Sequence, residues 1–206
     1  MPLTVSPESL RLLRAPGGRL TEDDYREVAD ELGIETAAMK AVVAIEAGAS
    51  HRGFYKKGMP VINFDLTMFR RFGRRRGVKT TGLPSGRTGS QAVHYDRLSK
   101  AMERDTATAR EATFWGMFQI GGFNWKKCGA KSLNDFVRRM SYSERDQLEL
   151  FAAFLRTTGL DEHLREHKWA AFARGYNGTA YARRRYHTRL AAAYAKFKKS
   201  EKSEHK

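Results

Sequence analysis

The sequence contains little cysteine, little acidic charge and no long apolar run. Its single cysteine, Cys128, cannot form an internal disulfide, so the fold must be stable without one. No apolar stretch approaches the length that is needed to cross a bilayer. No apolar segment of a secretory signal follows the first residues, so we expect synthesis in the cytoplasm without such a signal.

Acidic residues are outnumbered by basic ones. The chain has 23 Asp and Glu against 38 Lys and Arg, which gives a formal net charge of +15 and a pI near 10.1. A field of that sign raises the local concentration of polyanions. Nucleic acid, anionic lipid and the acid-rich bacterial envelope would all respond to it. The composition therefore predicts an anionic partner surface without identifying the polyanion.

The length of 206 residues and the 41% hydrophobic composition are typical of one domain with a sizeable core. Residues 1–20 are rich in Pro and Gly and are expected to form an arm. Residues 21–198 carry helical periodicity and are predicted to fold, whereas residues 199–206 are predicted to be a disordered basic tail. Helix N-caps are expected at Thr21, Thr36, Thr106, Ser132 and Ser141.

One short segment departs from the helical pattern. Residues 53–55 and 60–64 are rich in aromatic and β-branched side chains and flank a Lys-Lys-Gly turn, which predicts a small β-hairpin. Many helices with one hairpin make a mainly helical α+β fold. Residues 73–90 are rich in Gly and Arg and lack periodicity, so a mobile loop is expected there. Its arginines, with Arg70 and Arg71, are expected to form a basic patch.

Glu46 is the candidate catalytic acid. It stands at the end of an alanine-rich apolar stretch that begins at Thr36, which predicts a buried helix ended by Gly48. A carboxyl group in the last turn faces the negative end of the helix dipole and is partly buried, and both effects raise its pKa. A raised pKa keeps a proton available near neutral pH, as a general acid must. The alternative is an ordinary exposed glutamate at a helix end, which is the commoner case.

Asp65 has two interpretations. It follows the second predicted strand and precedes a helical pattern that begins at Leu66, so it can cap that helix. It can also be a second catalytic carboxylate. The sequence leaves both open.

Three segments together resemble a known family. Glu46 at its helix end is followed by a Gly-x-x-Gln segment at 116–119 and a Tyr-Asn-Gly segment at 176–178. This order is similar to the signature shared by goose-type lysozymes and soluble lytic transglycosylases. The likeness to bacteriophage-type N-acetylmuramidases is closer and runs through residues 114–124, 169–178 and 190–194. It covers roughly residues 21–198, and the Trp-Gly-x-Phe-Gln-Ile segment is its most specific part.

The resemblance implies a lysozyme-like muramidase domain that cuts peptidoglycan between N-acetylmuramic acid and N-acetylglucosamine. Glu46 would be the acid, with no metal and no organic cofactor. Gln119 would line the cleft and hydrogen-bond the sugar through its paired donor and acceptor. Tyr176 and Asn177 would lie close to Glu46. There the phenolic hydroxyl can bond the acid or the substrate, and Asn177 can simply hold the turn. The aromatic rings of Trp115 and Phe118 would add substrate contacts.

The sequence departs from the family pattern at two positions. Relatives tend to have Ser where this chain has Ala47, which removes a hydroxyl near the acid. They also tend to have His where this chain has Thr67. Asp65 still matches an acidic position of the family, and the resemblance implies that it orients water in an inverting hydrolysis. A lytic transglycosylase, which closes the muramic acid to an anhydro sugar, is the alternative enzyme.

Two hypotheses from other functional classes compete with the muramidase interpretation. His163, Glu166 and His167 match the His-x-x-Glu-His pattern of one class of zinc peptidases, against a solvated charged turn. The arginine runs 74–76 and 183–185 suggest a basic nucleic-acid binder, but no recognised motif accompanies them.

The partners that we expect follow from the resemblance and the charge. They are bacterial peptidoglycan and anionic cell-envelope polymers, with no specific nucleic acid. The protein is expected to be a monomer that acts on the cell wall, either as a phage endolysin or as an antibacterial effector. An effector would also need a secretion partner or an immunity protein.

Overall fold

The structure is a computed structural model that describes residues 16–47, 52–83 and 89–204. Within these ranges no helix has the length and apolarity of a membrane span. The elements in chain order are α2 (Glu22–Leu32), α3 (Thr36–Glu46), β1 (Phe54–Lys56), β2 (Met59–Pro60), β3 (Ile62–Phe64), α4 (Leu66–Arg75), α5 (Gln91–Met102), α6 (Thr106–Glu111), β4 (Thr113–Trp115), β5 (Ile120–Gly121), η1 (Gly122–Asn124), α7 (Leu133–Met140), α8 (Glu144–Thr158), α9 (Leu160–Arg165), α10 (Trp169–Asn177), η2 (Thr179–Tyr181) and α11 (Tyr186–Glu204).

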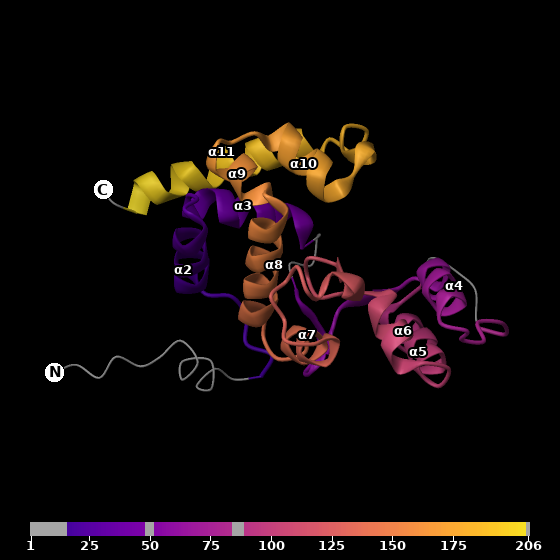
Figure 1. The fold of residues 1–206 in the computed structure, drawn as a ribbon. Helices are drawn as coiled ribbons and strands as arrows, with labels where there is room; N and C mark the ends of the chain where they lie inside the picture. The colour runs from indigo at the N-terminus through magenta and orange to yellow at the C-terminus, as the bar shows by residue number, and fades with distance from the viewer. Residues whose placement is uncertain (1–15, 48–51, 84–88, 205–206) are drawn as a thin grey trace.

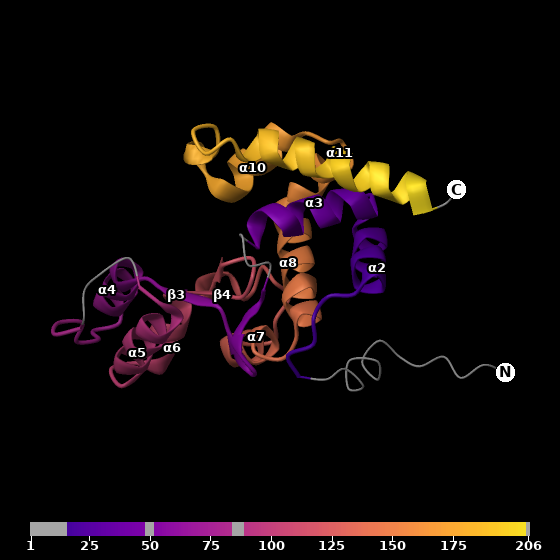
Figure 2. The ribbon, with the colours of Figure 1, turned by 180° about the vertical axis from the view of Figure 1, so that it is seen from behind.

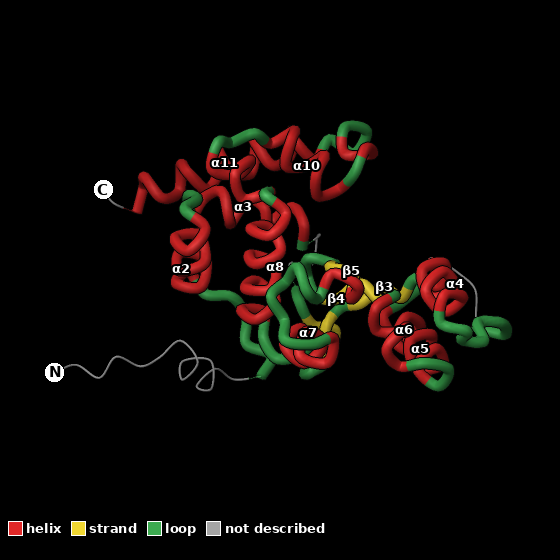
Figure 3. The backbone as a smooth tube through the Cα atoms, in the orientation of Figure 1, coloured by secondary structure: helices red, strands yellow, loops and turns green. Residues whose placement is uncertain are grey.

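The helices lie in two groups, with strands β3 and β4 between them (Figures 1 and 2). Helices α4, α5 and α6 lie at one end of the molecule, and α2, α3, α8, α10 and α11 lie at the other (Figure 3). Helix α8 is central to the larger group, because its Leu148, Phe151 and Leu155 are fully buried. Helix α11 packs along α3 and α10. This arrangement confirms the expected mainly helical α+β fold class.

The strands form two small antiparallel sheets. The predicted hairpin is confirmed at β1 and β2, but the expected second strand at residues 60–64 is divided. Its later part, β3, pairs with β4 in a separate sheet of order β3-β4-β5. Val61 joins the two sheets, since its N–H donates to the Gly53 carbonyl and its carbonyl accepts from the Gly116 N–H, both at 2.9 Å. The turn at Gly116 therefore lies beside the hairpin.

Two of the predicted helix caps are confirmed. The Thr21 hydroxyl accepts from the Asp24 N–H at 3.2 Å, and the Asp24 carboxylate accepts from the Thr21 N–H at 2.8 Å, which is a complete capping box. The Ser132 hydroxyl accepts from the Asp135 N–H at 3.0 Å. Both threonine and serine satisfy backbone donors that the first helical turn leaves unpaired.

Three other predicted caps are wrong by one or two residues, because a neighbour holds the cap position. The expected caps were Thr36, Thr106 and Ser141, whereas the residues that precede α3, α6 and α8 are Glu35, Asp105 and Ser143. Asp105 accepts from the Thr108 N–H at 2.7 Å, and Ser143 accepts from the Asp146 N–H at 3.1 Å. Adjacent residues of capping type cannot be separated by spacing alone.

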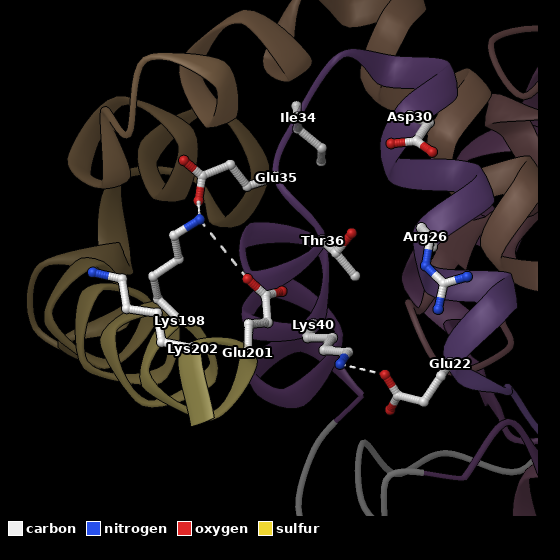
Figure 4. A pocket seen from close by; sticks show the side chains of 10 residues that line it. All are labelled: Glu22, Arg26, Asp30, Ile34, Glu35, Thr36, Lys40, Lys198, Glu201 and Lys202. Atoms are coloured by element: carbon white, nitrogen blue, oxygen red, sulfur yellow. Dashed lines mark ion pairs between the residues drawn. The ribbon is translucent and has the colours of Figure 1, made fainter. Parts of the chain in front are cut away.

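The C-terminal segment is helical, which corrects the expected disordered tail at 199–206. Helix α11 continues to Glu204, and residues 205–206 lie outside the described ranges. Its end is held against the start of α3 (Figure 4), because Glu35 accepts from the Tyr194 hydroxyl at 2.8 Å and pairs with Lys198 at 2.8 Å. These contacts supply the tertiary packing that a charged helix end needs to stay folded.

The loop expected at 73–90 begins later than predicted, because α4 continues through Arg75. Gly73 lies within that helix where a Cβ would come 2.6 Å from the Thr80 side chain, so the missing side chain lets the following segment fold back onto α4. Residues 84–88 of the expected loop lie outside the described ranges.

Candidate active site

Glu46 is the last residue of α3, as predicted. The helix behind it is anchored by Ala41, Val42 and Val43, which are buried. Ala47 is its C-cap, and Gly48, which was expected to end it, lies outside the described residues. The carboxyl group is thus fixed to a rigid, buried helix at the negative end of its dipole.

Burial raises the pKa of Glu46 from 4.5 to about 7, because a partly buried carboxylate loses hydration. Two neighbours oppose that rise in pKa: the hydrogen bond from Asn177 and the positive charge of Arg189 both stabilise the ionised form. Burial outweighs them. Near neutral pH a large share of Glu46 is protonated, which confirms the direction of pKa shift that the sequence predicted.

Asn177 contacts the acid directly. It is the last residue of α10, and its Nδ2 donates to Oε1 of Glu46 at 3.0 Å. Gly178 follows with φ 71° and ψ −168°, a conformation that favours glycine and lets the chain leave the helix immediately after Asn177. The sequence left open whether Asn177 only holds the turn. In the structure it orients the carboxyl group of Glu46.

Tyr176 supports the site from behind. Its hydroxyl donates to the Phe118 carbonyl at 2.6 Å, and its ring packs on Phe151 and Phe172. Burial, followed by the nearby charge of Glu46, raises the pKa of Tyr176 well above 10, so the phenol stays protonated. The sequence left open whether this hydroxyl bonds the acid or the substrate. In the structure it bonds neither oxygen of Glu46 but holds the turn that carries Gln119, and a contact with the substrate stays a prediction.

Phe118 and Trp115 belong to the core. Phe118 is 2% exposed and stacks on Phe151 with ring centroids 4.1 Å apart. Trp115 is 4% exposed, and its indole N–H donates to the Arg110 carbonyl at 3.0 Å. Side chains so covered cannot offer a ring face to a sugar, so the expected substrate contacts of these two residues are corrected to a packing role.

Gln119 is exposed, in contrast to its neighbours. Its backbone has φ 49°, in the left-handed region that non-glycine residues seldom adopt, and its Nε2 donates to the Gly116 carbonyl at 2.9 Å. Such strain persists where surrounding structure enforces it, and it often marks functional positions. The left-handed backbone thus directs the Gln119 side chain away from the core and to the surface, where a substrate can reach it.

Gln147 was missed by sequence reasoning, although it builds the turn. It is completely buried on α8, where its Oε1 accepts from the Met117 N–H at 2.8 Å. Its Nε2 donates to the Met140 carbonyl at 2.8 Å and to the Gly53 carbonyl at 3.2 Å. One amide group therefore joins the turn that carries Gln119 to α7 and to the β1–β2 hairpin. A polar residue on the buried face of a predicted helix was the signal available.

Glu144 performs a related task one turn earlier on α8. It is 4% exposed, and its two oxygens accept from the Gly53 N–H at 2.8 Å and the Leu20 N–H at 3.1 Å. The carboxylate therefore holds the start of β1 and the end of the N-terminal arm together. This pairing explains why an acidic residue is tolerated in the core.

Asp65 caps α4, as one of its two interpretations held. Its Oδ1 accepts from the Met68 N–H at 2.9 Å, and its own N–H donates to the Ala112 carbonyl at 3.0 Å. Among the residues described, no other carboxylate contributes to the pKa shift of Glu46. The capping role is established, and a catalytic role stays a prediction.

The His-x-x-Glu-His pattern does not form the geometry of a zinc site. Helix α9 ends at Arg165, and His167 follows with φ 52°, so the two histidines do not share one helix face. The His167 ring instead stacks on Trp169 and Tyr194, with centroids 5.4 and 4.6 Å away. Over the described part of the chain, no three His, Cys, Asp or Glu side chains gather as metal ligands would.

Arg189 provides a test of how the site tunes its acid. Because its positive charge lowers the pKa of Glu46, we expect Arg189→Gln to raise that pKa further. Activity that requires protonated Glu46 falls as pH rises through the pKa, so the alkaline limb of the kcat/KM profile should move to higher pH. Arg183→Gln, an equal charge loss at an exposed position, is the control. An equal displacement in both variants would contradict a specific effect of Arg189.

Comparison with known proteins adds two findings. The N-acetylmuramidase family model matches residues 35–198. The crystal structure of a Burkholderia AP3 phage endolysin is similar to this chain, with a TM-score of 0.82, 33% sequence identity, and coverage of 96% of this chain and 78% of that chain. The comparison with curated protein sequences gave no match.

Proposed function

The chain belongs to the N-acetylmuramidase family and is a lysozyme-type peptidoglycan muramidase, and we propose that Glu46 is its general acid. One observation carries the proposal. The Glu46 carboxyl group has a pKa of about 7 and is oriented by Asn177, so it holds a proton that it can release at physiological pH. A general acid works best when its pKa lies near the working pH.

In the proposed reaction, the Glu46 proton passes to the oxygen that links C1 of N-acetylmuramic acid to N-acetylglucosamine. The bond from C1 to that oxygen breaks, and its electron pair leaves with the oxygen as a hydroxyl group. Water adds to C1 and transfers a proton to a carboxylate base, the role proposed below for Asp65, so a new reducing end forms. Asn177 holds the Glu46 carboxyl group toward the substrate, and Gln119 hydrogen-bonds a sugar or acetamido group.

Mass analysis of the fragments from purified peptidoglycan tests this outcome. Hydrolysis leaves reducing muramic acid ends, whereas attack by the C6 hydroxyl leaves anhydro ends that are lighter by one water. We expect reducing ends. Predominantly anhydro ends would establish the transglycosylase alternative, and no cleavage would remove the enzymatic proposal.

We propose Asp65 as the second carboxylate, which orients the attacking water through the oxygen that does not cap α4. The substitution Asp65→Asn tests this role, because asparagine caps a helix about as well as aspartate but cannot accept the proton from water. Turnover should fall at least about a hundredfold, the lower end of the range for general acid–base catalysis, while the thermal midpoint changes little. Unchanged turnover would contradict a catalytic role for Asp65, and only its role as the N-cap of α4 would remain. A loss of both activity and stability would show that Asn fails as a cap.

The proposed biological role is that of a phage endolysin. The substrate is bacterial peptidoglycan, which the enzyme reaches at the cell wall after synthesis in the cytoplasm. The similarity to a phage endolysin supports this role over that of a secreted antibacterial effector. We assign the catalytic domain to residues 21–198.

A further inference from the structure

Helix α4 carries four arginines on one outward face, which we call the arginine face: Arg70, Arg71, Arg74 and Arg75. Their spacing of one, three and four residues places them on adjacent turns of the same side of the helix. All four are exposed, and together with Thr67 they surround a shallow depression. The opposite side of α4 enters the core through Phe69.

The arginine face has no acidic counterpart in the part of the chain that the structure describes. Within the described residues, none of the four guanidinium groups pairs with a carboxylate. Arg76, the next residue, differs: it pairs with Glu111 at 2.7 Å and donates to Thr108 at 3.0 Å, so it belongs to the fold. Of the basic patch expected from the sequence, Arg76 therefore belongs to the fold, and Arg87 lies outside the described residues.

The groove in Figure 4 shows the contrast. Its lining has as many acidic side chains as basic ones, and ion pairs join Lys40 to Glu22 and Lys198 to both Glu35 and Glu201. Such a charge-balanced surface attracts no polyanion. In contrast to this groove, the arginine face of α4 has no carboxylate in its lining.

An aromatic group borders the arginine face. Phe72, on the flank of α4 next to Arg75, contacts Phe123 with ring centroids 5.9 Å apart, and Phe123 contacts Phe114 at 6.2 Å. Phe123 is 40% exposed, which makes it one of few large apolar side chains that the described surface presents to solvent. Helix α4 thus carries four guanidinium groups without a carboxylate partner in the described residues, and its Phe72 flank is in contact with a partly exposed phenyl ring, so this part of the surface is amphipathic.

We propose that the arginine face of α4, together with Phe123, docks onto an anionic phospholipid bilayer. Guanidinium groups bind phosphate through paired N–H donors, and four of them on adjacent turns match a surface on which phosphates are closely spaced. The ring of Phe123 enters the boundary between headgroups and acyl chains, as apolar side chains of interfacial helices do. The protein binds the bilayer surface without spanning it.

The apolar component distinguishes a lipid surface from a nucleic acid. Nonspecific binding to duplex DNA is dominated by phosphate contacts and would use the arginines alone. Binding to an anionic bilayer is strengthened both by the positive charge and by the phenyl ring. The two partners therefore predict different effects of substituting Phe123, which makes the choice testable.

Sedimentation with large vesicles tests the proposal. We expect the full chain to bind vesicles of phosphatidylglycerol mixed with phosphatidylcholine, and not vesicles of phosphatidylcholine alone. Each basic side chain at an anionic bilayer contributes about a fivefold factor in affinity. Replacing Arg70, Arg71, Arg74 and Arg75 together by Gln should therefore weaken vesicle binding by about a hundredfold or more. Phe123→Ser should weaken vesicle binding severalfold and leave binding to duplex DNA unchanged.

The matched control removes the same charge from other elements. Lys127, Lys131, Lys196 and Lys199 are exposed, and their joint replacement by Gln should weaken vesicle binding less than about fivefold. Equal losses in the two quadruple variants would overturn the proposal, because binding would then follow net charge alone. Binding to DNA that is tighter than to vesicles at equal phosphate concentration would also overturn it.

Activity separates this surface from the catalytic site. On soluble peptidoglycan fragments, the variant of the arginine face should keep its turnover, with an unchanged circular dichroism spectrum. Loss of turnover in that variant would place α4 in the substrate site instead of at a lipid surface.

Discussion

Replacing Glu46 with Gln should reduce cell-wall lysis by about a hundredfold or more. Glutamine has the shape of glutamate but no proton that titrates, and a positioned general acid typically contributes two to four orders of magnitude. The rate of release of reducing ends from purified peptidoglycan measures this effect. Wild-type activity itself should decline as pH rises through about 7, where Glu46 loses its proton.

The stability of this variant is the control. Because the pKa of Glu46 is raised in the fold, its ionisation is harder there than in the unfolded chain. The contribution of Glu46 to wild-type stability is thus highest below a pH of about 4.5 and declines as the pH rises toward about 7. Glu46→Gln removes that decline and should be at least as stable at pH 8. Near-normal lysis by this folded variant would disprove the role of Glu46.

Gln147→Leu should lower the free energy of unfolding by roughly 3 kcal/mol or more, since it leaves the Met117 N–H and two buried carbonyls unpaired and each costs about 1–3 kcal/mol. For a chain of this size that corresponds to a fall in thermal midpoint of about 6–12 °C. Differential scanning calorimetry measures it. Activity should fall as well, because the turn that carries Gln119 loses its anchor.

The control for this variant lies on the same helix. Thr157 is on the exposed side of α8, and its hydroxyl bonds only the Ala153 carbonyl one turn back. Thr157→Leu should therefore change the thermal midpoint by no more than a few degrees. A Gln147→Leu variant as stable as this control would show that the three hydrogen bonds contribute little, against our expectation.

Local signals in the sequence predicted most of the fold. Apolar periodicity identified the helices, and Thr21 and Ser132 set helix starts that the structure confirms, because each is fixed by hydrogen bonds within a few residues. The prediction of a disordered tail at the end of α11 was wrong, because contacts with a residue distant in the sequence decide the structure there. A charged segment without periodicity is expected to be disordered by itself, but Glu35, far away in the chain, bonds Tyr194 and Lys198 and so holds the helix.

The candidate site was predictable where the resemblance supplied positions, and less so where contacts decide. Glu46 and Asn177 were expected to be close and are hydrogen-bonded. Trp115 and Phe118 belong to the Trp-Gly-x-Phe-Gln-Ile segment of the resemblance, but both are buried. A sequence motif does not indicate which of its side chains are buried. Gln147 has only the weak signal of a polar side chain on a buried helix face, and Arg189 has none, because their effects come from the packing of α8 and α11 around the site.

The separation of the site residues along the chain bears on when the enzyme becomes active during its synthesis. The carboxyl group of Glu46 is oriented by a residue 131 positions later, and Glu35 at the start of the same helix is bonded by Tyr194, 159 positions later. A ribosome must therefore translate nearly the whole domain before the acid is in place. Nascent chains and prematurely terminated products that stop before these residues carry Glu46 without its partners, so we expect lytic activity only when translation has passed Tyr194.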